Sequence, residues 1–109
     1  MKIGIPIDER SEDAPMASRF GRALYYLIYD LETKKYEYHE NPSAMARGGA
    51  GVKASEFLAS QGVKAVIAPR VGPNAEQVLR TSNITIYKGQ IEPWKNLIEK
   101  LEKNKIKTV

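Results

Sequence analysis

The sequence contains no cysteine and a single histidine, His39. Without cysteine the chain has no disulfide framework, no thiolate ligand for a metal and no cysteine nucleophile. One histidine without cysteine partners rarely forms a metal site, so we expect His39 to be a residue of the sheet surface. The thioether sulfurs of Met45 and Met16, in two long loops, are further secondary candidates for metal ligation. The sequence leaves the identity of any metal ligand open.

Long apolar runs are also absent. No segment approaches the roughly 18 residues that a membrane span requires, and the first residues lack the apolar stretch of a signal peptide. The glycines match neither a P-loop nor a dinucleotide-binding motif. No serine stands in a histidine–acid setting, and Asp8 has no second acid at the exit of the next central strand. We therefore expect a cytoplasmic protein that is not an enzyme and does not associate with membranes.

What is present is the composition of one ordinary globular domain. The 109 residues are 42% hydrophobic and 28% charged, and we assign residues 1–109 to one domain. The net charge of +4 permits attraction to nucleic acid or other anions without demonstrating it. Lysines late in the chain, between Lys95 and Lys107, alternate with glutamates, which is typical of a solvated surface. Nucleic acid is therefore not the partner that we expect.

Hydrophobic periodicity predicts eight elements in the order β-β-β-α-β-α-β-α. Alternating or continuous apolar runs predict five strands, at 3–7, 24–29, 36–40, 63–68 and 84–87. A helical period predicts three helices, over 50–61, from Pro73 through Leu79 and from about Pro93 through Leu101. Right-handed crossovers then favour an α/β fold with a five-stranded mixed sheet of order 3-2-1-4-5, in which strand two is antiparallel.

Three loops that place arginine beside glycine carry the candidate binding residues. In the predicted sheet the loops after strands one, three and four leave the same edge, at the point where open α/β sheets bind ligands. Helix starts offer unpaired N–H groups and the positive end of a dipole, and glycine lets a ligand approach the backbone. The candidates are Arg19, Phe20, Gly21, Arg22, Arg47, Gly48, Gly49, Gly51, Arg70, Gly72 and Asn74. We expect these loops to form an anion-binding site.

Four blocks of residues resemble one known family in the same order. They are Ile3-Gly4-Ile5-Pro6-Ile7-Asp8, Ser18-Arg19-Phe20-Gly21-Arg22-Ala23, Glu40-Asn41-Pro42 followed by Gly48-Gly49-Ala50-Gly51, and Gly72-Pro73-Asn74-Ala75. Over nearly its whole length the chain resembles the dinitrogenase iron–molybdenum cofactor family. This is the NifX/NafY-type domain that also ends NifB proteins.

The resemblance implies a ribonuclease H-like three-layer fold. It also implies a module that binds or carries an anionic iron–sulfur or iron–molybdenum cofactor precursor, with cofactor-assembly proteins as partners. Relatives often have histidine at the position of Arg19 and near Arg47, and arginine cannot ligate a metal because it stays protonated. In this chain we therefore expect electrostatic attraction by arginine, in place of metal ligation by histidine, to hold the cofactor precursor. Two alternatives remain: a small regulatory or protein-interaction domain, and nucleic-acid binding through the basic surface.

Overall fold

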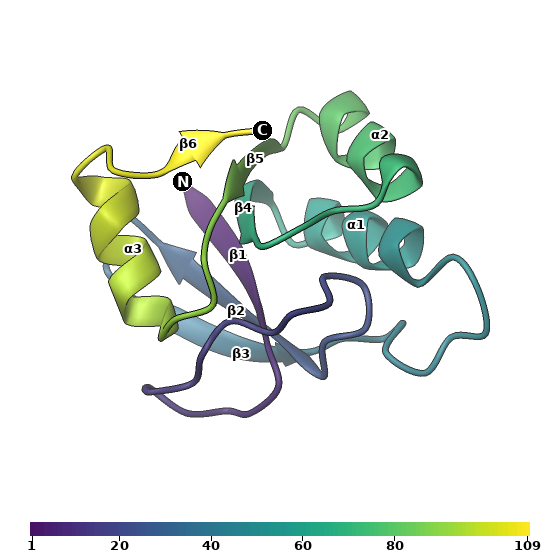
Figure 1. Ribbon diagram of the computed structural model, residues 1–109, viewed down its shortest axis with the longest axis horizontal. Coiled ribbons are helices and arrows are strands. Elements are labelled where there is room, and N and C mark those ends of the chain that lie inside the picture. The colour runs from purple at the N-terminus through teal and green to yellow at the C-terminus, as the bar shows by residue number, and fades with distance from the viewer.

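The computed structural model describes residues 1–109 as a mixed β-sheet between helices (Figure 1). The strands are β1 (Lys2–Ile7), β2 (Tyr25–Asp30), β3 (Tyr36–Glu40), β4 (Val63–Ala68), β5 (Thr85–Lys88) and β6 (Lys107–Thr108). The helices are α1 (Ala50–Ser60), α2 (Pro73–Thr81) and α3 (Trp94–Glu102). The sheet order is β3-β2-β1-β4-β5-β6. The predicted order of the first five strands and the antiparallel direction of β2 are confirmed, because β2 pairs antiparallel with both β1 and β3.

The predicted number of five strands is wrong, because a sixth strand is added at the β5 edge of the sheet. After α3, Asn104 adopts a left-handed backbone conformation with φ 56° and turns the chain back toward β5. The short strand β6 then pairs antiparallel with β5, with Thr108 opposite Tyr87 and Lys107 opposite Lys88. Two polar residues carry no hydrophobic pattern, so β6 exists through its pairing partner and not through local propensity.

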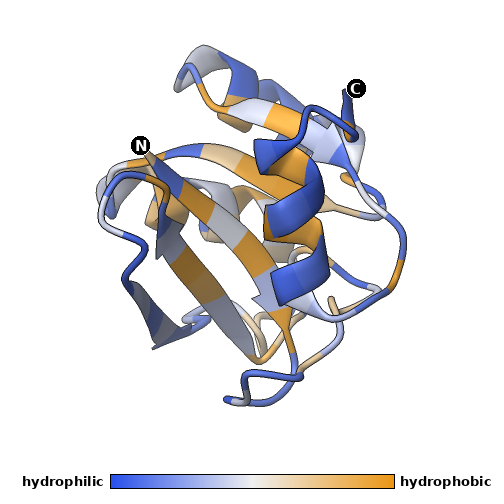
Figure 2. Cartoon of the chain, turned by 90° about the vertical axis from the view of Figure 1, so that its left-hand side faces the viewer, coloured by the Kyte–Doolittle hydropathy of each residue, from blue (hydrophilic) through white to orange (hydrophobic).

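The sheet has a buried cluster on each face, which makes three layers. On one face Ile3, Ile5 and Ile7 of β1 pack with the buried side of α3. On the other face Val63 and Val66 of β4 pack with α1 and α2. Figure 2 looks onto the α3 side, where apolar stretches of the strands lie beneath the helix. None of the three helices combines the length and apolar character that crossing a bilayer requires.

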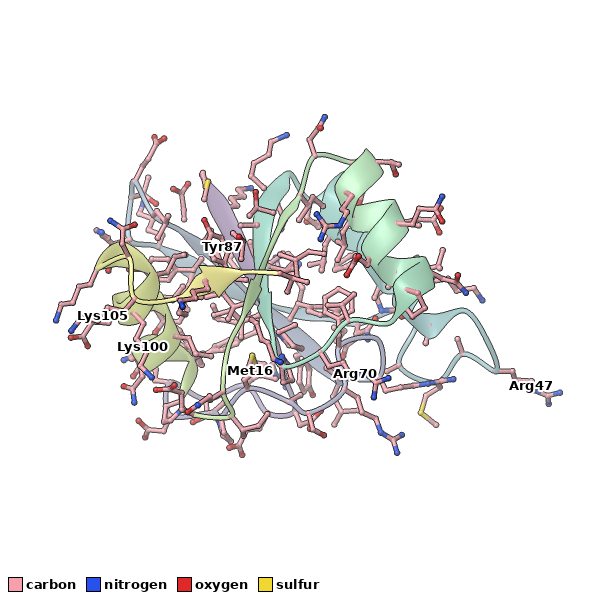
Figure 3. The ribbon with its side chains drawn as sticks, turned by 45° about the horizontal axis from the view of Figure 1, so that its top comes forward. Met16, Arg47, Arg70, Tyr87, Lys100 and Lys105 are labelled. Atoms are coloured by element: carbon pink, nitrogen blue, oxygen red, sulfur yellow. The ribbon has the colours of Figure 1, made fainter.

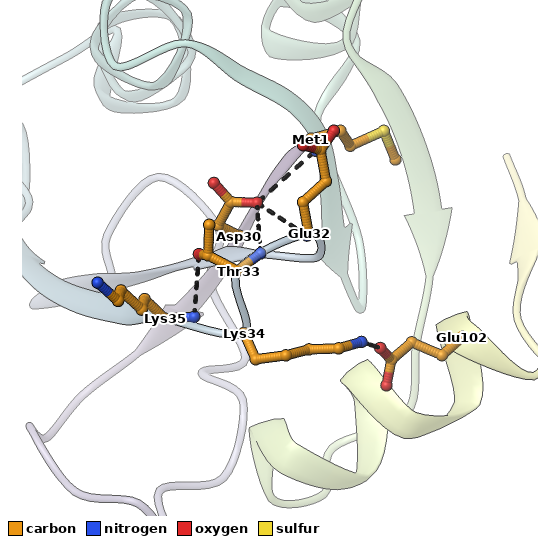
Figure 4. A network of polar contacts seen from close by, with 7 residues as sticks. All are labelled: Met1, Asp30, Glu32, Thr33, Lys34, Lys35 and Glu102. Atoms are coloured by element: carbon orange, nitrogen blue, oxygen red, sulfur yellow. Dashed lines mark hydrogen bonds and ion pairs between the residues drawn. The ribbon is translucent and has the colours of Figure 1, made fainter.

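The turn between β2 and β3 is built by polar contacts in place of a glycine pair (Figure 4). The Asp30 carboxylate accepts hydrogen bonds from the N–H groups of Glu32 at 2.9 Å and Thr33 at 3.5 Å. Lys34 has φ 64°, the left-handed conformation that asparagine or glycine usually supplies. The Lys34 ammonium is also bound to Glu102 of α3, which fastens the turn to the helix layer.

The long loop after β1 is anchored at the start of α3 before it reaches the opposite layer. Trp94 is 1% exposed, and its Nε1 donates to the carbonyl of Ser11 at 2.9 Å. The Trp94 N–H donates to Ala14 and the Met16 N–H to Glu92, both at 3.0 Å. With residues 11–16 fixed in this way, the following residues 18–22 are positioned beside α1.

Candidate anion-binding pocket

The three arginine–glycine loops converge on one open pocket of about 520 Å³. The pocket lies where β1 and β4 end and where α1 and α2 begin. Its lining residues are Ser18, Arg19, Phe20, Gly21, Arg22, Gly49, Ala50, Gly51, Val52, Arg70, Gly72, Pro73, Asn74 and Ala75. None of these residues is acidic, and none is histidine, cysteine or methionine. The pocket therefore offers positive charge and backbone donors.

Unpaired backbone N–H groups line the pocket at the two helix starts. The N–H groups of Ala50, Gly51 and Val52 have no acceptor, and no side chain caps α1. The same is true of Asn74 and Ala75 at the start of α2. Both helices begin after glycine, Gly49 with φ 66° and Gly72 in an extended conformation, so neither start carries a side chain that would occupy its own donors. Both dipoles add positive potential at this place.

The floor of the pocket depends on glycines that let backbones touch. A Cβ atom on Gly21 would lie 2.6 Å from the backbone nitrogen of Gly51, closer than real Cβ contacts allow. A Cβ atom on Gly51 would in turn lie 3.0 Å from the Cβ of Ala75 in α2. By contrast, nothing lies within 4 Å of a Cβ placed on Gly48, Gly49 or Gly72. Glycine is thus required for packing at the floor, whereas the rim is open.

The four candidate arginines have different environments. Arg19 and Arg70 line the pocket, are exposed, and form no ion pair or hydrogen bond within the chain. Arg22 also lines the pocket, but its Nη1 donates to the carbonyl oxygens of Ala44, at 3.4 Å, and Ala46. Arg47 and Gly48 do not line it; Figure 3 shows Arg47 at the tip of its loop, directed away from the body of the protein. The free charge at the pocket therefore comes from Arg19 and Arg70.

A buried polar pair, Asn41 and Ser43, joins two of the loops; Asn41 belongs to one of the blocks that resemble the family, but neither residue is among the candidate binding residues. The Asn41 Nδ2 donates to the carbonyls of Gly21 at 3.0 Å and Ala23 at 2.8 Å, and its Oδ1 accepts from the Ser43 N–H at 3.0 Å. The Ser43 hydroxyl also donates to the carbonyl of Ala50, at 2.9 Å. Asn41 precedes a proline and lies two residues before a serine, a combination typical of a side-chain-stabilised turn, and this was the available signal.

Tyr26 of β2 contacts Phe20, one of the residues that line the pocket. Its hydroxyl donates to the carbonyl of Phe20, and its ring packs against the Phe20 ring with centroids 5.7 Å apart. Tyr26 is buried, and burial raises the pKa of its hydroxyl because the phenolate would lose its hydration. The hydroxyl thus stays a proton donor and fixes the loop from which Arg19 projects.

The candidate metal ligands lie apart from the pocket and from one another. His39 packs against Phe57 and lines a separate cavity with Gln61, at the opposite end of α1. Met45 is 89% exposed on the 41–49 loop, and Met16 is 2% exposed in the core beneath α3. No group of three or more histidine, cysteine, aspartate or glutamate side chains could hold a metal ion. Any metal-bearing ligand in the pocket would therefore contact N–H groups and guanidinium groups.

Comparison with known proteins agrees with this architecture. An uncharacterized protein of Methanocaldococcus jannaschii is 32% identical over 91 residues, which cover 81% of this chain and 74% of the relative. The NMR structure of a Thermotoga protein described as a candidate NifB protein superposes with a TM-score of 0.86 at 30% identity, over 98% of this chain and 91% of the other.

The apo form of the orange protein from Desulfovibrio gigas shares the fold, with a TM-score of 0.95 at 24% identity, over 99% of this chain and 92% of the other. The family model for dinitrogenase iron-molybdenum cofactor proteins matches residues 1–104. The chain therefore belongs to the dinitrogenase iron-molybdenum cofactor family.

Proposed function

We propose that this protein is a non-enzymatic module that binds an anionic iron–sulfur or iron–molybdenum cofactor precursor in the pocket between α1 and α2. The observation that supports it most is the set of unpaired N–H groups at two helix starts, in residues that line a pocket with Arg19 and Arg70 and no acid. Such donors suit an anion that the protein does not have to ligate. The family membership supports a cofactor-related cargo.

The donor set decides how the cargo is held. A cluster with a negatively charged sulfide or oxide surface can accept hydrogen bonds from backbone N–H groups and from guanidinium groups. Covalent ligation has no candidate in the lining, because it contains no cysteine, histidine, carboxylate or methionine. We therefore expect reversible, salt-sensitive binding, as befits a protein that transfers its cargo to cofactor-assembly proteins.

The test compares two variants that remove charge at and beside the pocket. In Arg19→Gln/Arg70→Gln, each lost guanidinium contact should cost about 1.5–3 kcal/mol, or about 10- to 100-fold in affinity. The control is Arg47→Gln, which removes one positive charge from a side chain outside the pocket. Anaerobic calorimetry with a thiolate-capped cubane iron–sulfur cluster and with molybdate measures the affinity of each variant. Equal affinity of the double variant and the unaltered protein would contradict the proposal.

A second candidate function, protein interaction, is favoured by the 41–49 loop. Met45 is 89% exposed, yet the backbone around it is held by Arg22, Asn41 and Ser43. Methionine is a flexible, polarizable side chain that binding surfaces often use, so an exposed methionine on a loop with a fixed backbone suits contact with another protein. Met45→Glu should abolish capture of a cofactor-assembly partner while leaving calorimetric anion binding unchanged, which separates this function from the first.

A further inference from the structure

One edge of the sheet is a regular strand without the usual protection. β3 has five residues and is the outermost strand on the β2 side of the sheet (Figure 1). It contains no proline, and its pairing with β2 runs without a bulge from Tyr36 to Glu40. The opposite edge is β6, which has only two residues. Natural sheets protect an edge by shortening it or by a proline or a bulge, and β3 has none of these devices.

The free edge of β3 presents backbone hydrogen-bonding groups to solvent. Just beyond the strand, the Asn41 N–H donates to the Leu24 carbonyl at 3.0 Å. Hydrogen-bonded pairs alternate along an antiparallel ladder, so the odd-numbered residues of β3 bond to β2 in the same way. The N–H and C=O groups of Tyr36, Tyr38 and Glu40 therefore point outward. No hydrogen bond from a loop or turn reaches them.

The side chains of β3 differ between the two faces of the sheet. Tyr36 and Tyr38 are half-buried on the α3 side, with ring centroids 5.8 Å apart. Glu37 and His39 lie on the other face, where His39 packs against Phe57 of α1. The His39 Nε2 is 3.6 Å from the Glu37 carboxylate, and the Glu37 side chain is 78% exposed. One face of the strand thus carries an acid and a hydrogen-bond donor two positions apart.

We propose that β3 pairs with β3 of a second copy of this chain, antiparallel and with the twofold axis at Tyr38. In a twofold interface each contact occurs twice, so the strand has to be complementary to itself. Tyr36 then lies opposite Glu40 of the second copy, and the outward N–H and C=O groups of both strands all find partners. Glu37 lies opposite His39 of the second copy, at a non-hydrogen-bonded position where side chains come closest. An imidazole N–H donates to a carboxylate whether or not the ring is protonated.

Neighbouring registers do not meet these conditions. Moving the twofold axis to Glu37 places the Glu37 side chains of both copies opposite each other, and like charges in that arrangement are destabilising. Moving the axis to His39 places Pro42, which has no N–H, opposite the outward groups of Tyr36. An axis between two residues opposes outward groups to residues whose groups point toward β2. The sequence of β3 therefore selects one register of self-pairing.

The pairing leaves the arginine pocket free. β1 and β3 both run antiparallel to β2, so both end on the side of the sheet where the pocket lies, and no residue of β3 lines it. The second copy runs in the opposite direction, which places its pocket at the other end of the joint sheet. The proposal therefore does not rest on the cofactor function. Arg19→Gln/Arg70→Gln should dimerise like the unaltered protein.

The interface is small, so we expect a weak dimer with a dissociation constant of roughly 10–100 μM. Sedimentation equilibrium between about 10 μM and 1 mM measures it, at about 0.15 M salt to screen the net charge of +4 on each copy. Amide exchange is a second measurement that needs no variant. The amides of Tyr36, Tyr38 and Glu40 should exchange about fourfold more slowly at about 1 mM than at about 20 μM, relative to those of β4.

Charge reversal tests the register. Glu37→Lys opposes an introduced lysine to His39, and His39→Glu opposes two acids, so each variant alone should lose about tenfold or more in dimer affinity. When the two variants are mixed, the introduced lysine faces the introduced glutamate, and Glu37 of one faces His39 of the other. The mixture should therefore form a heterodimer with about the affinity of the unaltered protein. The control is Glu56→Lys, which makes the same charge change at an exposed position of α1 and should dimerise normally.

The proposal is overturned if the unaltered protein stays monomeric up to about 1 mM, or if its outward amides exchange at a rate independent of concentration. It is also overturned if either charge variant alone dimerises as tightly as the unaltered protein, or if mixing the two folded variants restores nothing. Melting curves show whether each variant is folded, and the amide measurement on the unaltered protein decides the matter if one is not.

Discussion

The backbone of Gly21 packs directly against the backbone of Gly51, so that a Cβ atom on Gly21 would lie 2.6 Å from the Gly51 nitrogen. This contact joins the loop after β1 to the first turn of α1. It also fixes the position of the loop that carries Arg19 relative to the first turn of the helix. The pocket depends on it.

The replacement Gly21→Ala should therefore destabilise the fold, since its neighbour is backbone that cannot rotate away. We expect a loss of about 1–3 kcal/mol in the free energy of unfolding, the usual cost of overpacking. Urea denaturation measures it. The matched control is Gly48→Ala, where a Cβ meets no atom within 4 Å. A similar loss in both variants would show that the Gly21 contact is not the cause.

Asn41→Ala should destabilise the protein and loosen the pocket together. The change removes hydrogen bonds to Gly21, Ala23 and Ser43 and leaves buried carbonyl groups without donors. We expect about 2–4 kcal/mol, because several partners are lost at once. Thermal unfolding gives the stability, and amide exchange of Ser43 and Ala44, whose N–H groups donate to Asn41, gives the local effect. Unchanged exchange at these two amides would show that the Asn41 side chain does not hold the loop.

Arg22→Gln should release the 41–49 loop while the rest of the fold stays intact. The Arg22 guanidinium donates to the carbonyls of Ala44 and Ala46, and no other side chain reaches these two groups. Amide exchange should therefore accelerate at Ala44 and Ala46, whose N–H groups donate to Asn41 and Ser43, and remain as before in the strands of the sheet. Arg47→Gln serves as the control, because that side chain makes no hydrogen bond within the chain. Protection that persists in Arg22→Gln would contradict the assignment.

Stability should fall in acid. The pKa of Glu12 is lowered by the hydrogen bond from Tyr36 and then by Lys95, that of Asp30 chiefly by the Glu32 N–H, and that of Glu99 by Lys103. A carboxyl group with a folded-state pKa below its unfolded value binds fewer protons when folded. Its contribution is therefore present above the ordinary value of 4.5 for glutamate or 3.8 for aspartate, and is lost as the pH falls through the lowered pKa.

Melting temperatures between about pH 6 and pH 3 test this dependence. Glu12→Gln should flatten part of the decline, whereas Glu56→Gln, at an exposed position without an ion pair, should leave it unchanged. The Glu12 bond also raises the pKa of Tyr36 to about 12, so Tyr36 remains a donor throughout this range. If the melting temperature of Glu12→Gln depends on pH as that of the unaltered protein does, Glu12 does not contribute to the loss of stability in acid.

The sequence predicted the elements that have their own hydrophobic period. The five longer strands and all three helices carry apolar residues at strand or helix spacing, and right-handed crossovers then determine their order. β6 could not be predicted, because Lys107 and Thr108 become a strand only by pairing with the edge of β5. The convergence of the three loops followed from the sheet order, since it depends only on which strand ends meet.

The direction of single side chains in the loops could not be predicted from the sequence. Arg47 stands beside glycines that open a helix, yet the Arg22 bonds to Ala44 and Ala46 shape the loop so that Arg47 points outward. His39 was expected to be a surface residue of its strand. Its distance from the pocket reflects the strand face it occupies and its contact with Phe57 at the far part of α1. Both outcomes depend on tertiary contacts, which the sequence pattern does not predict.

The contact between Gly21, Gly51 and Ala75 also makes stability and binding chemistry separable traits. The walls of the pocket meet through backbone and the smallest side chains, so their spacing does not depend on what projects from the rim. Side chains at positions 19 and 70 are exposed and can be exchanged without repacking the core. Evolution can therefore refit this scaffold for a different cargo by changing a few rim residues, and so can an engineer.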